Sequence, residues 1–407
     1  MADYLTAELP GTGGTLKQTP EDFEVEEIPL YLPCDDGEHL YLDIEKRGVT
    51  THEVVRQLSR SCRLHERDIG YAGLKDAQAL TRQLVSIPAD REPLLDTFEM
   101  NGVRVLSTRR HGNKLRLGHL AGNRFRITLR DTETNAGEKA QSVIDILSSR
   151  GVPNLFGPQR YGLLGNNALV GRAMLRGEHQ QAVDTLLGDP EMILNRRWRE
   201  GIELYRSGDF AGAARALPKG CRNERSIVQA LARGKTRQQA LERLPRSVLR
   251  LFLSAWQSRL FDRLVLQRLQ KLGKLERGDL AYKHANGACF LVEDQVAEQD
   301  RADAFEISPT GPMFGSKMPL AEGSPGERER VALTDEELPE NAFKLAKGLS
   351  LKGERRPLRV PLNDAKVTEE DQRLVISFSL PRGSFATTVM REIMKNDTDN
   401  CIHFQEG

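Results

Sequence analysis

The chain has 407 residues, of which 39% are hydrophobic and 29% are charged, proportions that exclude a disordered acidic tail and a membrane protein. No run of about 18 apolar residues is present, so the sequence predicts no membrane span. Lysine and arginine number 59 against 58 aspartates and glutamates, and this net charge of +1 argues by itself against a nucleic-acid-binding protein. The length predicts two or three domains, and five scattered cysteines without a Cys-x-x-Cys pair predict a reduced, cytoplasmic protein without a zinc site.

The N-terminal part of the chain alternates short strands and helices. Residues 40–45 and 125–129 alternate apolar and polar side chains, which is typical of half-buried strands. Thr51 is expected to cap a helix with one broad apolar face. A further helix is expected from about Gly137 to Arg150, with Gly151 ending it.

The middle of the chain has a different texture, because from about residue 168 to 269 the pattern is almost entirely helical. Helices are expected at 180–187, 211–216, 226–233 and 245–269. The step Asn286-Gly287 between two short apolar runs predicts a β-hairpin. The acidic residues 321–340 are expected to form an exposed loop that leads to a helix.

The last 50 residues return to strand and helix, with a strand at 374–380 and a helix that Ser384 is expected to cap. The order mixed, helical, mixed suggests one domain inserted into another.

Charge is segregated along the chain. Residues 104–130 hold eight basic residues and no acidic one, residues 216–250 have a net charge of +7, and residues 321–340 have a net charge of −5. A basic strand face suits a phosphate backbone, although such a face is often balanced by acidic residues elsewhere in the fold. Because the first run spans an expected β-hairpin, we favour RNA or DNA binding there.

One segment, residues 70–83, is a glycine-punctuated turn that bears the pair Lys75-Asp76 and leads into an apolar strand. On such a loop an aspartate is commonly a turn residue. The functional alternative is a carboxylate nucleophile, which is ionised near neutral pH.

This segment resembles the signature of the tRNA pseudouridine synthase D (TruD) family at Gly73, Lys75, Asp76, Ala79, Thr81 and Gln83. Further similarities follow in the same order at 13–17, 21–27, 114–118, 122–125, 152–162, 253–261, 308–315 and 383–387. Together they span most of the chain.

The resemblance implies an α+β fold, in which a pseudouridine synthase domain is built around a bent mixed or antiparallel sheet. It implies that residues 1–156 and 354–407 form this catalytic domain and that 157–353 form an inserted, largely helical α/β TRUD domain. It also implies that a flipped-out uridine of tRNA, at position 13, is isomerised to pseudouridine with Asp76 as the catalytic nucleophile. No cofactor, metal, membrane or obligatory protein partner is expected, and tRNA is the expected partner.

The resemblance also assigns binding residues. Phe23, Asn123 and Phe385 match positions that line the uridine pocket, where rings sandwich the base and an amide reads its edge. The alternatives are core aromatics for the two phenylalanines and a turn residue for Asn123. Lys17 matches a basic residue that pairs with the aspartate and orients it, whereas Arg160 either reaches a phosphate or pairs with a carboxylate at the domain junction.

Two rival functions stay open at this point. A non-catalytic RNA-binding module is disfavoured by the retained Asp76, and a nuclease is disfavoured because no carboxylates or histidines cluster. Asp262 departs from the family, which often has asparagine there, and the basic run 216–250 is a candidate for additional RNA contact. The chemical route, through a covalent adduct or a glycal, is not decided by the residues.

Overall fold

The computed structural model describes residues 4–346, 348–370 and 373–396. The chain divides into two compact units, which we call the insert unit (Pro153–Arg359) and the sheet unit (the chain up to Val152, with Val360–Asn396). Two short strands, β8 (Val152–Pro153) and β13 (Arg359–Val360), lie where the chain passes from one unit to the other. The domain boundaries expected at 156/157 and 353/354 stay a prediction.

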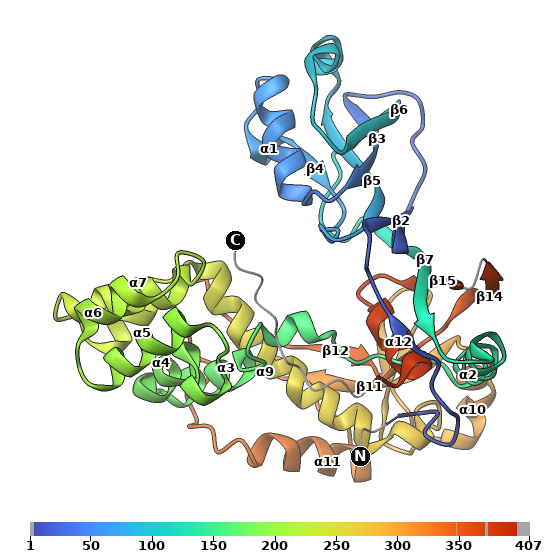
Figure 1. The fold of residues 1–407 in the computed structure, drawn as a ribbon. Helices are drawn as coiled ribbons and strands as arrows, with labels where there is room; N and C mark the ends of the chain where they lie inside the picture. Colours follow the sequence, from blue (N-terminus) through green and yellow to red (C-terminus); the bar gives the residue numbers. More distant parts are fainter. Residues whose placement is uncertain (1–3, 347, 371–372, 397–407) are drawn as a thin grey trace. The chain divides into compact units, whose positions relative to one another are not determined.

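The sheet unit is built around one sheet with both parallel and antiparallel neighbours (Figure 1). Its path runs β14-β15-β7-β2-β5-β3-β6, with β1 added to β7 and β4 to β5, and only β2 and β5 are parallel among the described pairs. The strands are β1 (Gly13–Thr15), β2 (Phe23–Pro29), β3 (His39–Arg47), β4 (Gly70–Tyr71), β5 (Leu80–Pro88), β6 (Val103–His111), β7 (Leu120–Thr132), β14 (Asn363–Glu370) and β15 (Arg373–Pro381). The expected mixed sheet and α+β class are confirmed. The hairpin expected for residues 104–130 is wrong, because β6 pairs with β3 and β7 pairs with β2 and β15.

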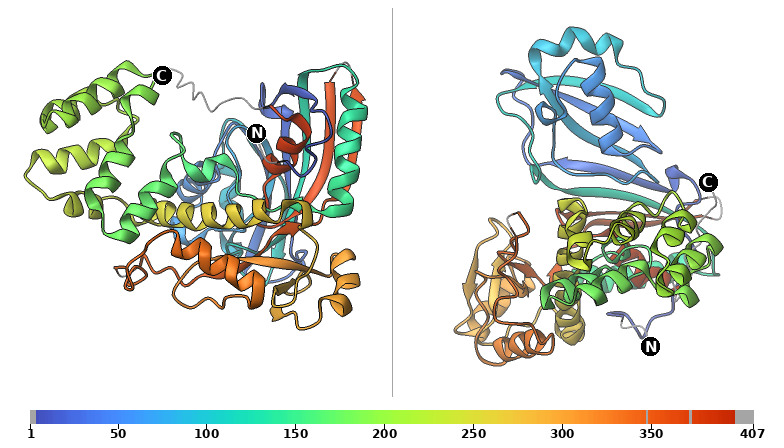
Figure 2. Two further views of the ribbon diagram at one scale, coloured as in Figure 1. Left: turned by 90° about the horizontal axis from the view of Figure 1, so that it is seen from below. Right: turned by 90° about the vertical axis from the view of Figure 1, so that its left-hand side faces the viewer.

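Three α-helices cover this sheet (Figures 1 and 2): α1 (Thr51–Ser61), α2 (Ala136–Arg150) and α12 (Ala386–Met394). Buried side chains of α1, such as Val54 and Leu58, pack with those of β3, such as Leu42, in one apolar core. The expected end of α2 is confirmed, since Gly151 ends it with a φ of 87° that suits glycine.

Two expected helix caps are wrong. Thr50, not Thr51, caps α1, because the Thr50 hydroxyl accepts from the Glu53 N–H while the Glu53 carboxylate accepts from the Thr50 N–H. Phe385, not Ser384, is the N-cap residue of α12, and no side-chain hydrogen bond caps that helix.

The insert unit is mostly helical at its start and mixed toward its end. Its helices are α3 (Asn167–Arg176), α4 (His179–Leu187), α5 (Arg196–Arg206), α6 (Phe210–Ala216), α7 (Arg222–Ala232), α8 (Arg237–Glu242), α9 (Arg246–Gln267), α10 (Gln295–Asp303) and α11 (Gly323–Thr334). The long helix α9 runs through the insert unit, α3 packs against it, and α4 to α7 gather near one of its ends (Figures 1 and 2). The buried side chains of α9 include Phe252, Trp256 and Leu260, and they join most of these helices in one core.

A four-stranded sheet in the order β10-β9-β11-β12 completes the insert unit. Its strands are β9 (Leu280–Lys283), β10 (Cys289–Leu291), β11 (Ile307–Met313) and β12 (Glu354–Pro357), and β9 and β10 confirm the hairpin expected around Asn286-Gly287. The exposed loop expected at 321–340 is wrong, since α11 occupies much of that segment.

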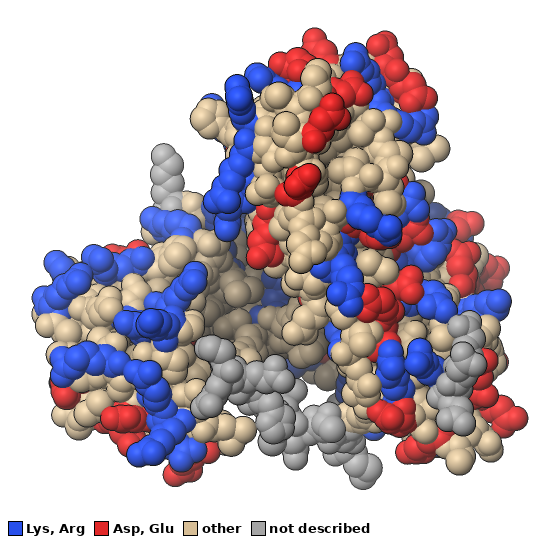
Figure 3. Space-filling model, turned by 45° about the horizontal axis from the view of Figure 1, so that its top comes forward, with Lys and Arg blue, Asp and Glu red and all other residues tan. Residues whose placement is uncertain are grey.

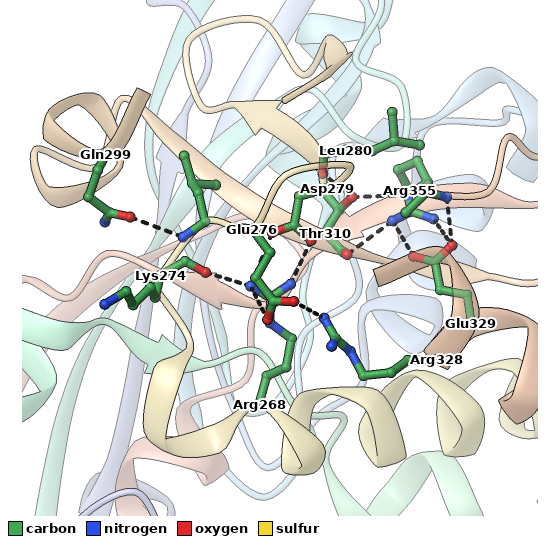
Figure 4. Close-up of polar contacts among 12 residues, drawn as sticks. Arg268, Lys274, Glu276, Asp279, Leu280, Gln299, Thr310, Arg328, Glu329 and Arg355 are labelled. Atoms are coloured by element: carbon green, nitrogen blue, oxygen red, sulfur yellow. Dashed lines mark hydrogen bonds and ion pairs between the residues drawn. The ribbon is translucent and has the colours of Figure 1, made fainter. Parts of the chain in front are cut away.

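Two buried ion pairs lie in this part of the insert unit, and one of them holds Glu329 of the acidic segment (Figure 4). The Arg355 guanidinium donates to both oxygens of Glu329 on α11, at 2.9 and 2.7 Å, and also to the hydroxyl and carbonyl oxygens of Thr310 on β11. A second pair joins Arg268 to Asp279 at 2.6 and 3.1 Å. These contacts neutralise buried carboxylates and tie α11 to β11 and β12.

Candidate active site

Asp76 lies on the loop between β4 and β5, with 28% of its side chain exposed. Lys17 Nζ donates to Asp76 Oδ2 at 2.5 Å, and the backbone N–H of Gln78 donates to Oδ1 at 3.1 Å. Burial alone would raise the pKa of Asp76, but the hydrogen bond and charge of Lys17, the Gln78 N–H and the charge of Lys46 together hold it below its ordinary value. Asp76 is therefore an ionised carboxylate with limited access to solvent.

Lys46 fixes the backbone on which Asp76 stands. Its side chain is 1% exposed, and Nζ donates to the carbonyl oxygens of Val49 at 2.6 Å, Asp76 at 2.9 Å and Lys75 at 3.4 Å. Burial lowers the pKa of Lys46 from 10.5 to about 8, against the opposing charge of Asp76. An ammonium group buried on β3 thus holds the loop through two of its carbonyl groups, those of Lys75 and Asp76, and adds positive charge near Asp76.

A second buried lysine anchors the same loop to β2. Lys75 Nζ lies 2.7 Å from Glu27 Oε2, and the two side chains are 5% and 2% exposed. Burial raises the pKa of Glu27, although the charge of Lys75 opposes this. The Thr51 hydroxyl accepts from the Lys75 N–H at 3.0 Å and donates to Gln83 Oε1 at 2.8 Å. Asp76 is therefore presented by a loop held on both sides.

Lys17, which donates to the Asp76 carboxylate, also contacts one of the expected pocket residues. Lys17 Nζ lies 4.3 Å from the centre of the Phe23 ring, within the range of a cation–π interaction. Phe23 is only 6% exposed and meets the ring of Phe125 edge to face at 6.2 Å. The structure thus brings Lys17, Phe23 and Asp76 together, while Phe23 also serves the core.

Asn123 lies on β7, opposite Glu27 of β2 on one side and Leu380 of β15 on the other. Its Oδ1 atom is buried, and no described residue donates a hydrogen bond to it. An unsatisfied buried acceptor is costly in a folded protein and suits a ligand that donates to it. Phe385 lies after β15, at the start of α12, and is partly exposed.

Arg160 belongs to the insert unit, whereas the other five expected site residues belong to the sheet unit. Its guanidinium donates to Ser254 Oγ at 3.1 Å and lies 5.1 Å from the centre of the Phe156 ring. Burial lowers the pKa of Arg160, and the negative charge of Asp262 opposes this. Neighbouring Asp262 accepts from the Tyr161 hydroxyl and the Phe156 N–H.

The basic run 104–130 does not form a free basic face. Six of its eight basic side chains make ion pairs with carboxylates of the sheet unit: Arg104–Glu45, Arg109–Asp35, Arg110–Glu92, Arg124–Glu26, Arg126–Glu24 and Arg130–Asp22. The interpretation of this run as a nucleic-acid-binding face is therefore not supported, because its charge is balanced across the sheet.

Sequence reasoning missed the two buried groups that hold the loop, although a signal was present. Lys46 continues the inward alternation of Leu40, Leu42 and Ile44 on β3, and Glu27 continues that of Phe23 and Val25 on β2. A charged residue at an apolar position of a strand is buried only with partners. That pattern predicts a structural or functional contact.

Comparisons with known proteins show the same family for the whole chain. The model of the family described as "tRNA pseudouridine synthase D (TruD)" matches residues 1–393. The chain belongs to the TruD family. The tRNA pseudouridine synthase D of Syntrophotalea carbinolica is 52% identical over 397 residues, covering 98% of this chain and all of that protein. The protein of the same name from Geobacter sulfurreducens is 54% identical over 393 residues, 96% of each chain.

A solved structure agrees with the TruD assignment. The putative tRNA pseudouridine synthase D of Methanosarcina mazei is 28% identical, with a TM-score of 0.79 over 97% of this chain and 96% of that one. The chain is thus a tRNA pseudouridine synthase of the TruD family, an enzyme that isomerises uridine in tRNA to pseudouridine. None of the described helices combines the length and hydropathy needed to cross a bilayer.

Proposed function

We propose that Asp76 is the catalytic nucleophile, or the catalytic base on the alternative glycal route, and that the target is the uridine at position 13 of tRNA. The observation that carries the first part is the state of Asp76: an ionised carboxylate with 28% of its side chain exposed, contacted by Lys17 and presented by a loop that Lys46 and Lys75 hold. A pure RNA-binding module gains nothing from such a carboxylate, because it would repel phosphates. Position 13 rests on the family resemblance.

In the proposed reaction the target nucleotide is flipped out of the RNA stack, at a cost of about a few kcal/mol. The Asp76 carboxylate then acts on the ribose, either by attack on C1′ or by removal of a proton from C2′. As the N1–C1′ bond breaks, either an Asp76–C1′ ester bond or a C1′=C2′ double bond forms, according to the route. The uracil then turns and C5 bonds to C1′, which breaks the Asp76–C1′ bond on the first route and lets C2′ take its proton back from Asp76 on the second. C5 then loses its proton and N1 ends with one, so the product is an isomer of the substrate.

The other residues receive roles that fit their positions. Lys17 keeps Asp76 ionised and oriented, while Phe23, Asn123 and Phe385 line the uridine pocket. The unsatisfied Asn123 Oδ1 suits an N–H of the uracil edge. Arg160, in the insert unit, is proposed to bind a phosphate of the RNA. A tRNA substrate also supports the expectation of a cytoplasmic protein.

The test incubates unmodified tRNA transcripts with the wild type and with Asp76→Asn, and maps pseudouridine by carbodiimide-dependent stops of reverse transcription. The wild type should give a stop at position 13 and the variant none. Asp131→Asn is a matched control, because Asp131 lies on β7 at a φ of 55°, a conformation that asparagine also adopts readily. A stop that persists in Asp76→Asn refutes the nucleophile, and a stop that survives replacement of uridine 13 by cytidine refutes the position.

A further inference from the structure

The basic run of the insert unit behaves differently from that of the sheet. Six exposed side chains stand around α7, α8 and the start of α9, and we call them the basic helical surface: Lys219, Arg222, Arg233, Lys235, Arg243 and Arg246. No ion pair or side-chain hydrogen bond joins any of them to another described residue. Figure 3 shows lysine and arginine side chains gathered on this helical part, at the left, with fewer acidic ones between them.

The two acidic residues of the same segment do not neutralise this surface. Glu224 is partly buried, and this burial raises its pKa, which disfavours its charged form. Glu242 is exposed and accepts a hydrogen bond from Gln238 at 3.1 Å. The charge of the basic helical surface is therefore available to an external anion.

The six side chains are spread over a length that suits an extended polyanion. Lys219 and Arg222 stand at the start of α7, and Arg233 and Lys235 follow its end, so the eleven residues of the helix separate them by about 16 Å. Arg243 directly follows α8 and Arg246 is the first residue of α9, so both lie at the next connection between helices. Sites spaced in this way match a row of phosphates better than a single small anion.

The surface lacks the side chains that read single-stranded bases. Among the described residues, the large hydrophobic side chains that are exposed are leucines, valines and a methionine, with no aromatic ring. Base stacking on aromatic side chains is the usual means of binding single strands, whereas double-stranded RNA is bound through its shape and phosphates. The charge without aromatic rings therefore favours a double-stranded arm.

We propose that the basic helical surface binds the phosphate backbone of a double-stranded arm of the tRNA substrate. This inference rests on the proposed function only in taking tRNA as the substrate. The contribution is electrostatic and independent of base sequence, since each phosphate neutralised releases condensed counterions. It gives the enzyme a second hold on tRNA besides the target uridine.

The test compares two triple variants that remove the same charge. Arg222, Arg243 and Arg246, each replaced by glutamine, remove unpaired charges, whereas Arg104, Arg109 and Arg110, replaced likewise, remove charges that are already paired with carboxylates. Binding of an unmodified tRNA transcript is measured from about 50 to 200 mM KCl, where such contacts are strongly salt-dependent. Thermal unfolding checks that both triple variants stay folded.

The helical triple variant should bind tRNA at least ~10-fold more weakly at low salt and lower the slope of log K against log salt by about 2 to 3. In the modification reaction the helical triple variant should have a higher KM for tRNA with kcat little changed. The sheet triple variant should bind tRNA within about twofold of the wild type. Equal losses in both variants, or none in the helical one, overturn the proposal. Pseudouridine formation by the wild type is scored separately, so that failure of the proposed reaction is distinguished from failure of this surface.

Discussion

Removing one partner of the Lys75–Glu27 ion pair should destabilise the sheet unit more than removing both. The Nζ–Oε2 distance is 2.7 Å and both side chains are at most 5% exposed, so either charge left alone would be buried without a partner. Loss of one partner of such a pair costs about 3 to 5 kcal/mol, whereas loss of both is often close to neutral. We expect Lys75→Met and Glu27→Gln each to cost that much, and the double variant to cost less than either.

The pH dependence of the single variant adds a second signature. Burial already raises the pKa of Glu27 while Lys75 is present, so loss of Lys75 should raise it further. The folded Lys75→Met protein then binds a proton that the unfolded chain releases, and its stability falls as the pH rises. The variant should therefore be closer to the wild type at pH 5 than at pH 8.

Hydrogen exchange of peptides from β4 and β5 measures this destabilisation where it arises. Both tryptophans of the chain, Trp198 and Trp256, lie in the insert unit, so their fluorescence in urea follows that unit as an internal control. Costs that simply add in the double variant would refute the reasoning, because they would mean that each side chain is stabilised independently of the other.

Three further predictions concern titrating groups. Lys17→Met should raise the pKa of Asp76 and move the acidic limb of kcat/KM to higher pH, and an unmoved limb would contradict the role of Lys17. Because the pKa of Lys46 is about 8 in the fold and 10.5 ordinarily, the wild type should gain up to about 3 kcal/mol from this group between those pH values, and urea unfolding of Lys46→Met should lack the gain. Burial raises the pKa of Asp262 from 3.8 to about 6, so the wild type should lose up to about 3 kcal/mol between those pH values. The Asp262→Asn variant should not show this loss of stability when its unfolding is measured by tryptophan fluorescence. The same dependence of the unfolding free energy on pH in both proteins would contradict the raised pKa of Asp262.

Local signals in the sequence were sufficient for many elements. The hairpin at Asn286-Gly287, the end of α2 at Gly151 and the long apolar helix α9 follow from turn chemistry and periodicity, and the structure confirms all three. The sequence also contains the signal for the cap of α1, since Thr50 with Glu53 three residues later is a capping box, and this signal distinguishes Thr50 from Thr51.

Features that depend on contacts between residues far apart in the sequence cannot be predicted from such local signals. The acidic composition of 321–340, with its Pro and Gly residues, predicts a loop, and it carries no sign of Arg355, the partner that buries Glu329 from 26 residues further along the chain. The candidate site shows the same limit. The family motif is sufficient to predict Asp76. The contact between Lys46 and the carbonyl oxygen of Asp76, 30 residues further along the chain, can be predicted only when the pairing of the strands is known.

The two basic runs show what a charge count along the chain can and cannot predict. On strands, alternate residues share a face, and the neighbouring strand offers a partner opposite each position: Arg126 meets Glu24 and Arg124 meets Glu26, because β2 and β7 lie in register. At the ends of short helices no such ladder exists, so arginines there stay unpaired unless another element reaches them. Equal runs of positive charge therefore differ in their free charge according to the secondary structure that carries them. Residues 216–250, which carry slightly less net charge than residues 104–130, are for this reason the stronger candidate for binding RNA.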